Sequence, residues 1–494
     1  MIYWIDIDRC NMYQTNEMQI IAMRTEDGNG GADLAKIIWL IDATSYKKDI
    51  DYELLNIKKD YFKIKSYVRQ QVIGRHVLPT QKTFSTGLLR IATLLKRLGY
   101  SVKYFHLADF LSENMIETCL IPPMIAAFGC VCPTIPVCNK LAKKMKDYHE
   151  NVITAVGGAH INIALQETMH RYIFFDRYVY GYDIDAVSRL INGEAGGNIY
   201  EADDVIDGSS DQMPYVDYSI LPYSLNEYDI NLFSTLGCPF RCAYCQDGQV
   251  PYYENLLDGG ISRLRGQLVP KKLIHFFDST LGYSEHRLLK VCGALSSIHH
   301  DYILSCDIRA EFISEKTITA LEKAGFKEVR IGLETTDPKV LKRNNREILP
   351  EEVMRKIELV RGKSELYLTL YTVSGLPGYT LETYKKNKEM YEYLLKTRIV
   401  DEIKNAQYVP YPRDGIDFGQ RGVIIKDNDW ENYDRQSFPV YETAELSRQQ
   451  IWDEYLDTAR VINEAWMKGW QIQSIDAIRD ADIYPEYIVE NYLQ

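Results

Sequence analysis

The chain has 494 residues, of which 46% are hydrophobic and 26% charged, the composition of a globular protein with a sizeable core. Because 57 basic side chains stand against 69 acidic ones, the net charge is −12, and no basic run suggests binding to a nucleic-acid backbone. The sequence has neither the roughly 18–20 apolar residues in a row that span a membrane nor a recognisable leader, so we expect a cytoplasmic protein without nucleic-acid or membrane partners. Ten cysteines are too sparse for a disulfide scaffold and favour metal binding or catalysis.

The first half of the chain alternates short apolar runs with helical patterns. Strands are predicted at 36–42, 101–107, 124–132, 151–156 and 178–180, and helices at 87–98, 137–148 and 183–191. This alternation predicts an α/β domain with a parallel, doubly wound, Rossmann-like sheet, which we place at residues 1–195. Residues 1–35 and 45–80 do not follow the rhythm and receive no assignment.

The second half restarts the alternation after a segment rich in Gly, Asp and Ser at 192–214, so we place a linker at 196–222. Six strands are predicted at 230–234, 273–277, 303–308, 329–333, 367–373 and 405–409, with helices at 285–297, 315–324, 350–360 and 381–394. Six strand–helix units predict an open, partial (βα)6 barrel over 223–425. A charged amphipathic helix at 444–468 predicts a small helical cap within 426–494.

The sharpest motif is the CxxxCxxC formed by Cys238, Cys242 and Cys245 after the first strand of the second half. Three thiolates on one tight loop can bind three irons of a 4Fe-4S cluster and leave the fourth iron open. An open coordination position is typical of a reactive metal site. A zinc site and buried core cysteines are the alternatives, but 246–260 offers no fourth Cys or His, and the close spacing favours the cluster.

This motif, placed at the first strand end of a partial barrel, resembles that of the radical S-adenosylmethionine (SAM) enzymes. Segments at the later strand ends are also similar to motifs of that family: 276–279 (FFDS), 331–334 (IGLE), 374–378 (SGLPG) and 408–412 (YVPYP). The resemblance implies a 4Fe-4S cluster and SAM as cofactors, with SAM contacts from Tyr244, Asp278, Ser279, Arg309, Glu334, Ser374, Gly375, Val409 and Pro410. Taken singly, these residues have structural alternatives: Glu334 could cap the next helix, and Gly375 could make a turn.

The first half is similar to the cobalamin-binding domain that precedes the barrel in a subclass of these enzymes. The similarity lies in 86–102, which ends in LGYSV, and in 129–134, 156–160 (VGGAH) and 180–183. It implies cobalamin contacts from Cys132, Pro133, Thr134, Gly157, Gly158, Ala159, His160 and Gly181. No D-x-H-x-x-G motif occurs, so we expect cobalamin without a histidine ligand on cobalt. His160 then lines the nucleotide tail or makes a loop hydrogen bond, and Cys130, Cys132 and Cys138 are expected in the core rather than at a second cluster.

The resemblance implies C-methylation of an unactivated carbon of a small biosynthetic intermediate, through a 5′-deoxyadenosyl radical and methylcobalamin. The expected electron donor is a flavodoxin or ferredoxin. Tyr411, Arg413 and Asp414, just past the sixth strand, are expected to line the substrate. Two alternatives stay open: the same architecture with ring contraction, cyclisation or oxidation as its outcome, and a non-catalytic Fe-S or cobalamin sensor.

Overall fold

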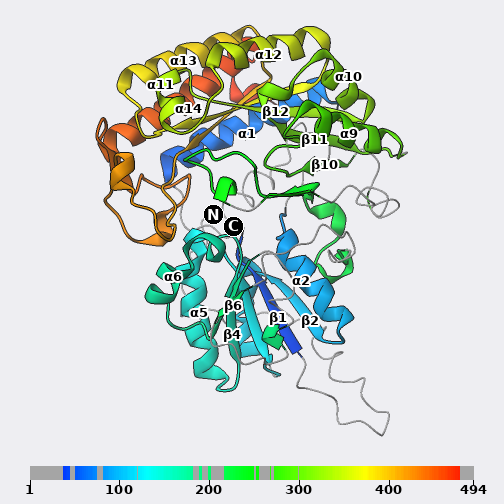
Figure 1. Cartoon of the computed structure of the whole chain (residues 1–494), viewed down its shortest axis with the longest axis vertical. Helices are drawn as coiled ribbons and strands as arrows, with labels where there is room; N and C mark the ends of the chain where they lie inside the picture. The colour runs from blue at the N-terminus through cyan, green and yellow to red at the C-terminus, as the bar shows by residue number, and fades with distance from the viewer. Residues whose placement is uncertain are drawn as a thin grey trace.

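The computed structural model of the chain has two lobes, with the first half mainly in one and the second half in the other (Figure 1). It describes residues 37–44, 51–74, 82–119, 121–181, 189–191, 199–201, 216–249, 252–254, 268, 272–298 and 300–478. The unassigned residues 1–35, most of the predicted helix 183–191 and most of the 192–214 segment lie outside these ranges. Within them, no helix is long and apolar enough to cross a lipid bilayer.

The first lobe is built on a six-stranded parallel sheet in the order β2-β1-β3-β4-β5-β6, which confirms the doubly wound prediction. Its strands are β1 (Ile37–Asp42), β2 (Ser101–His106), β3 (Ile125–Gly129), β4 (Ile153–Gly157), β5 (Arg177–Tyr180) and β6 (Ile199–Glu201). Its helices are α2 (Thr86–Arg97), α3 (Leu107–Ser112), α4 (Met115–Thr118), α5 (Ile135–Tyr148) and α6 (Ile161–Arg171). The order reverses between β1 and β3, and open α/β sheets bind ligands beside such a reversal.

The central strand β1 is apolar from Ile37 to Ile41, as expected of a strand whose two faces are both covered by helices. Ile38 and Leu40 belong to the core that includes α2, whereas Trp39 and Ile41 belong to the core that includes α3 and α5. Alternate residues of a strand point to opposite faces, so one run of five apolar residues serves both layers.

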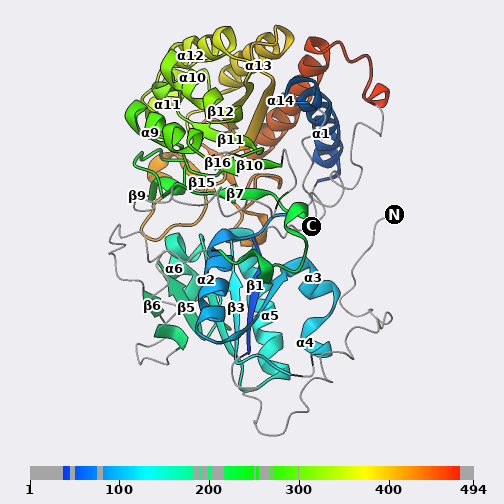
Figure 2. The same cartoon turned by 90° about the vertical axis from the view of Figure 1, so that its right-hand side faces the viewer.

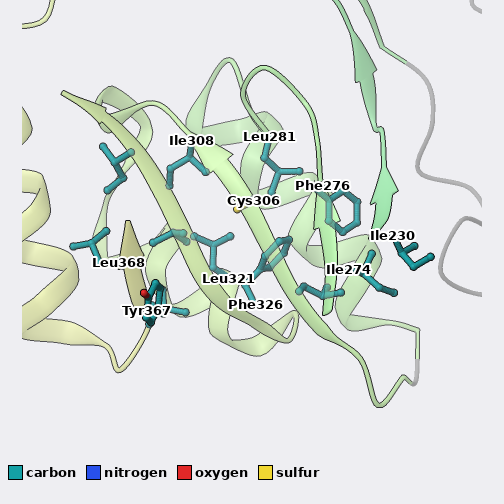
Figure 3. Close-up of a cluster of buried hydrophobic side chains, with 14 of the residues drawn as sticks. Ile230, Ile274, Phe276, Leu281, Cys306, Ile308, Leu321, Phe326, Tyr367 and Leu368 are labelled. Carbon is teal, nitrogen blue, oxygen red and sulfur yellow. The ribbon is translucent and has the colours of Figure 1, made fainter. Parts of the chain in front are cut away.

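The second lobe is a partial barrel of six parallel strands in the order β14-β13-β12-β11-β10-β7, as predicted. The strands are β7 (Ile230–Leu232), β10 (Leu273–Phe276), β11 (Ile303–Ile308), β12 (Phe326–Glu334), β13 (Tyr367–Ser374) and β14 (Glu402–Gln407). The helices are α9 (Glu285–Ser296), α10 (Glu315–Lys323), α11 (Pro338–Arg343), α12 (Pro350–Lys363), α13 (Leu381–Lys396) and α14 (Arg448–Gly469). Figure 3 shows part of the apolar core of this lobe, with Phe276, Ile308, Leu321 and Phe326 packed together.

Helix α1 (Tyr52–Val72) is the main departure from the sequence reading, since it comes from the first half but packs on the barrel. It lies beside α14 in Figures 1 and 2, with the Tyr61 ring 5.2 Å from that of Trp466. Asn463 donates to the carbonyl of Ile57 at 2.9 Å. A segment placed by sequence in 1–195 therefore belongs structurally to the second lobe.

The C-terminal region contains the expected long helix, α14, which joins the helical layer of the barrel by packing on α13 and α1. It also contains a hairpin of β15 (Val423–Ile425) and β16 (Tyr441–Thr443). The sequence places the end of the barrel at residue 425, which falls between these two strands. The hairpin was not predicted, because its strands are short and a long turn-rich segment separates them. A second short hairpin, β8 (Thr235–Leu236) with β9 (Tyr253–Glu254), flanks the cysteine motif.

Candidate active site

The three motif cysteines lie on one loop that follows β7 and β8, at the carboxyl end of the barrel strands. All three are free, and Cys242 is buried. Backbone N–H groups point to the sulfurs, from Phe240 to Cys238 and from Asp247 and Gly248 to Cys245. Burial raises the pKa of Cys238 and raises that of Cys245 to about 12, so these thiols would need a bound metal to be thiolates at neutral pH.

The donor set fits an iron–sulfur cube. In the described ranges no three His, Cys, Asp or Glu side chains converge on a single metal position. A cube does not need such a point, because each cysteine binds a different iron.

Asp278 anchors the start of the cysteine loop. Its carboxylate accepts hydrogen bonds from the N–H of Ser234 (2.7 Å), the N–H of Thr235 (2.8 Å) and the Ser234 hydroxyl (2.5 Å). Burial outweighs these bonds and raises the pKa of Asp278 to about 6. Ser279, the next residue, donates to Asp247 at 2.8 Å on the far side of the motif. Both side chains thus brace the loop, and their expected contacts with SAM stay predictions.

Arg309 lies directly beside the cysteine loop. Its guanidinium stacks 3.7 Å from the centre of the Phe240 ring, and Nη1 is 3.9 Å from the sulfur of Cys242. Nε donates to Glu311 at 3.1 Å, which fixes the orientation of the group. The position expected from sequence therefore places a cation next to the cluster ligands.

Glu334 ends β12 in a left-handed conformation with φ of +66°, which is uncommon for a residue other than glycine. The strand pairing shifts between Gly332 and Glu334, and a Cβ at position 332 would collide with Oε1 of Glu334. Tyr244 donates to the carboxylate, and Arg346 attracts it, yet burial raises the pKa of Glu334. The next helix is capped by Asp337 instead, so the alternative role of Glu334 as a helix cap is wrong.

The remaining SAM candidates lie together at the ends of β13 and β14. Ser374 donates to Asn405 at 3.1 Å, and Tyr408 N–H donates to the carbonyl of Ser374 at 2.9 Å. Tyr441 of β16 donates to the carbonyl of Gly375 at 2.6 Å and fills the space where a Cβ would stand. Val409, before Pro410, is buried in the same group.

Three residues of the loop after β14 make hydrogen bonds to three different parts of the molecule. Arg413 donates through Nη2 to the carbonyl of Cys245 at 3.1 Å, while its buried Nε and Nη1 have no hydrogen-bond partner in the structure. Tyr411 accepts a hydrogen bond from Arg435. Asp414 accepts from the N–H groups of Gln166 (2.9 Å) and Glu167 (3.3 Å) in the first lobe, and its expected role in lining the substrate stays a prediction.

The geometry of α6 explains the role of Asp414. The helix breaks at Ala164 (φ −140°, ψ 43°), so the N–H groups that follow lack their usual helical acceptors. A carboxylate from the second lobe takes their place, as an N-cap would. The loop after β14 is thereby fixed to the helix after β4.

The cobalamin candidates at the end of β4 divide into exposed and buried groups. Gly158 and Ala159 are exposed, but Gly158 (φ +109°) also sits where a Cβ would be 2.7 Å from the carbonyl oxygen of Cys130. Its neighbour Gly157 accepts from Cys130 N–H at 2.9 Å. These two glycines therefore allow the ends of β3 and β4 to pack closely together.

His160 is 1% exposed and hydrogen-bonds through Nε2 to Thr168 at 3.1 Å, beneath the ring of Trp430 at 4.7 Å. Burial lowers the pKa of His160 to about 3, so the ring is neutral. Of the two roles expected for this histidine, the structure shows the local hydrogen bond.

The loop after β3 forms a 3-10 turn, Cys132–Thr134, against a second 3-10 turn, Trp430–Asn432, from the other lobe. Cys132 and Thr134 are buried, and Thr134 accepts from the N–H of Val131 at 3.2 Å, while Pro133 is partly exposed. Gly181 is held by the Asn162 side chain at 2.9 Å. The groups that face outward for a cofactor are thus Pro133, Gly158, Ala159 and Gly181. Cys130 and Cys138 are buried, as expected.

Residues 232–390 match the family model described as the Radical SAM superfamily. The chain carries a radical SAM domain. Its cofactors are therefore a 4Fe-4S cluster and SAM, as the cysteine loop indicated.

The two-lobed fold is shared with two solved cobalamin-dependent radical SAM proteins. The methyltransferase TsrM of Kitasatospora setae, solved with cobalamin and a [4Fe-4S] cluster, is 13% identical with a TM-score of 0.59, over 86% of this chain and 91% of TsrM. OxsB, solved with aqua-cobalamin and SAM, is 14% identical with a TM-score of 0.52, over 87% of this chain and 56% of OxsB.

Two curated relatives carry names that point to different reactions. An uncharacterised methyltransferase of Pyrococcus horikoshii is 22% identical over 341 residues, 63% of this chain and 72% of the relative. The anaerobic magnesium-protoporphyrin IX monomethyl ester cyclase of Rubrivivax gelatinosus is 19% identical over 417 residues, 76% of this chain and 74% of the cyclase.

Several contacts of the site had no sequence signal. Tyr441 and Trp430 come from the C-terminal region, which sequence reading described only as helical, and Arg346 lies between two helices without a motif. Each is separated from its partner by many residues, so local spacing could not reveal it.

Proposed function

We propose that this radical SAM enzyme uses cobalamin to methylate an unactivated carbon of a small molecule. The observation that carries the proposal is the shared architecture, since 86–87% of the chain aligns in space with two cobalamin-dependent radical SAM proteins. The methyltransferase relative of P. horikoshii supports the same reaction class.

The way the lobes meet supports a substrate between them. Asp414, after β14, binds the helix that follows β4, and Trp430 covers His160 at the end of β4. Segments beyond the carboxyl ends of strands from both sheets therefore meet, and those ends are where each of these folds binds its ligands. Figure 2 shows the segment around β15 and β16 between the two lobes.

The chain's own residues orient the cofactors and substrate. Glu334, held by Tyr244, offers a carboxylate to an ammonium or hydroxyl group, and Arg309 offers a cation beside the cysteines. Pro133, Gly158 and Ala159 offer accessible backbone to cobalamin. When bound, SAM and the cluster supply a carbon-centred radical that removes a substrate hydrogen, and cobalamin supplies the methyl group. A flavodoxin or ferredoxin is the proposed electron donor.

A second candidate keeps the architecture and changes the outcome. Similarity to the R. gelatinosus cyclase favours ring formation or oxidation without methyl transfer. Both candidates begin with hydrogen abstraction, so only the fate of the methyl group separates them.

Analysis of the SAM-derived products under strong reductant tests the proposal. The cobalamin-loaded enzyme is expected to form S-adenosylhomocysteine as well as 5′-deoxyadenosine, because one SAM methylates cobalt and another supplies the radical. Formation of 5′-deoxyadenosine alone would favour the second candidate. If the reconstituted protein cleaves no SAM, both candidate reactions are contradicted and a sensor role is favoured. The Cys242→Ala variant, which lacks a cluster ligand, is the control and should form no 5′-deoxyadenosine.

A further inference from the structure

The inner face of the barrel sheet is charged, unlike the outer face, which packs on helices. At the amino end of the strands, Glu328 and Glu402 are fully buried. Lys65 Nζ lies 2.7 Å from Glu402, Arg330 Nε lies 2.8 Å from Glu328, and Arg69 also pairs with Glu328. Helix α1 supplies Lys65 and Arg69, so it closes this end of the barrel with neutralised charges.

A second polar layer follows two residues further along each strand. Arg330 Nη1 lies 3.1 Å from His275 Nε2 and 3.3 Å from the Tyr371 hydroxyl. The same histidine nitrogen is 3.2 Å from Asp307. Lys404 completes the layer, with its ammonium 5.4 Å from the centre of the Tyr371 ring.

Lys404 differs from the other charges of this inner face. Its side chain is exposed, and Glu402 and Asp307 attract it without forming a hydrogen bond to it. Arg330 is paired with Glu328, and Asp307 has His275. Lys65, Arg69 and Arg330 are each in direct contact with a glutamate, whereas Lys404 has only the longer-range attraction of two carboxylates.

An exposed aromatic surface lies on the same inner face. Phe277 comes two residues after His275, so the two side chains share a face, and their ring centres are 5.6 Å apart. Phe277 is 55% exposed and makes an edge contact with Phe233 at 5.7 Å. The strand order places β10 and β14 near opposite edges of the curved sheet, so Phe277 and Lys404 approach the barrel interior from two sides.

The Lys404 layer lies just below the cysteine loop. Asp307 lies on the inner face of β11, and Arg309, whose Nη1 is 3.9 Å from the sulfur of Cys242, comes two residues later, just past the end of that strand. Two residues of a strand span about 7 Å. A molecule held in this layer can therefore reach toward the cluster while its far end stays anchored.

We propose that the substrate of the site is a carboxylic acid with a planar, apolar body, whose carboxylate binds the ammonium of Lys404 and whose body packs on Phe277. A single ammonium without a directly bonded carboxylate suits a monoanionic carboxylate better than a phosphate dianion. This inference rests on the proposed function, since it names the substrate class of the same site.

The proposal is tested by measuring the affinities of three matched probes by calorimetry, with the full chain and its reconstituted cluster. The probes are phenylacetate, its uncharged counterpart phenylacetamide, and phenyl phosphate. The native protein should bind phenylacetate about tenfold more tightly than the amide, the effect of one charge-assisted contact. The Lys404→Met variant should lose this preference, and Lys404→Arg should keep it. Lys385→Met, at an exposed lysine on α13, is the matched control.

Each other outcome contradicts the proposal. If the native protein binds acid and amide equally, or does not bind the acid up to its solubility, the proposed carboxylate site does not exist. Both results come from the native protein, so they hold whether or not Lys404→Met folds. A preference that survives in Lys404→Met assigns the anion to another group. Tighter, Lys404-dependent binding of phenyl phosphate replaces the carboxylate by a phosphate. None of these measurements requires SAM cleavage, so they separate this inference from the reaction type.

Discussion

Glu334 combines three features: a positive φ, a half-buried carboxylate with a raised pKa, and a tyrosine from the cysteine motif as hydrogen-bond donor. Such local strain is typical of functional sites. We expect Glu334→Gln to weaken SAM binding about tenfold or more, because a charge-assisted hydrogen bond is lost, with iron content unchanged. Equilibrium SAM binding measures this. The exposed Glu347→Gln variant on the following segment is the control, and unchanged affinity in Glu334→Gln would remove the residue from the SAM site.

Lys404 makes substrate binding pH-dependent. The exposed side chain of Lys404 lies on the inner face of the barrel, where the surrounding protein desolvates its ammonium and lowers its pKa to about 8. Lys65 of α1 and Arg330 of β12 lower this pKa further, whereas Glu402 and Asp307 oppose the shift. Because the neutral amine cannot attract an anion, phenylacetate binding should weaken as pH rises through about 8. Phenylacetamide binding should stay constant over the same range. A carboxylate affinity that does not change between pH 7 and 9 would contradict this assignment.

Among the elements, α1 couples its own folding to that of the barrel sheet. Arg69 pairs with Glu328, whose pKa is held far below its usual range by Arg330, Arg69 and Lys65 despite burial. We expect Arg69→Met to lower the free energy of unfolding by about 2 kcal/mol, less than the ~3–5 kcal/mol of a fully unpaired buried charge because Arg330 remains. Urea unfolding measures this. The Asn56→Ala variant, at an exposed position of α1, should change little, and an Arg69→Met protein as stable as the native one would show that this ion pair does not couple α1 to the barrel.

Helix α6 depends on the second lobe for part of its hydrogen bonding. Asp414→Ala leaves the N–H groups of Gln166 and Glu167 without their acceptor, at a cost of about 1 kcal/mol. Hydrogen exchange at these two amides should accelerate about fivefold, and the exposed Asp417→Ala variant, which caps only Gly419, should leave it unchanged. Unaltered exchange in Asp414→Ala would mean that the Asp414 carboxylate does not hold these two amides, although the Asp414 N–H still donates to the carbonyl of Ile163 at 2.8 Å.

Strands and helices were well predicted from the sequence because their signals are local. The apolar run of β1, buried on both faces, and the cysteine spacing are examples. Helix α1 was missed because its apolar positions Leu54, Ile57, Ile64 and Val68 sit among many charges, whose partners Glu328 and Glu402 lie far along the chain.

The candidate site shows the same division between local and distant signals. Cys242 and Glu334 stand in short motifs and were identified from them, although their cofactor contacts remain predictions. Asp278 and Asp414 were assigned to SAM and substrate, yet each binds backbone N–H groups of a segment more than forty residues away in sequence. A carboxylate at a strand end looks the same in sequence whether it binds a ligand or a loop.

On the scale of the whole molecule, the proposed reaction requires an iron–sulfur cluster in the second lobe and cobalamin in the first. Anaerobic reconstitution with iron, sulfide and hydroxocobalamin, followed by gel filtration and metal analysis, tests this most directly. We predict about four iron atoms per chain together with stoichiometric cobalt that stays bound through the column. A protein that holds its iron–sulfur cluster but elutes without cobalt would contradict the cobalamin assignment and leave a radical SAM enzyme whose first lobe serves another purpose.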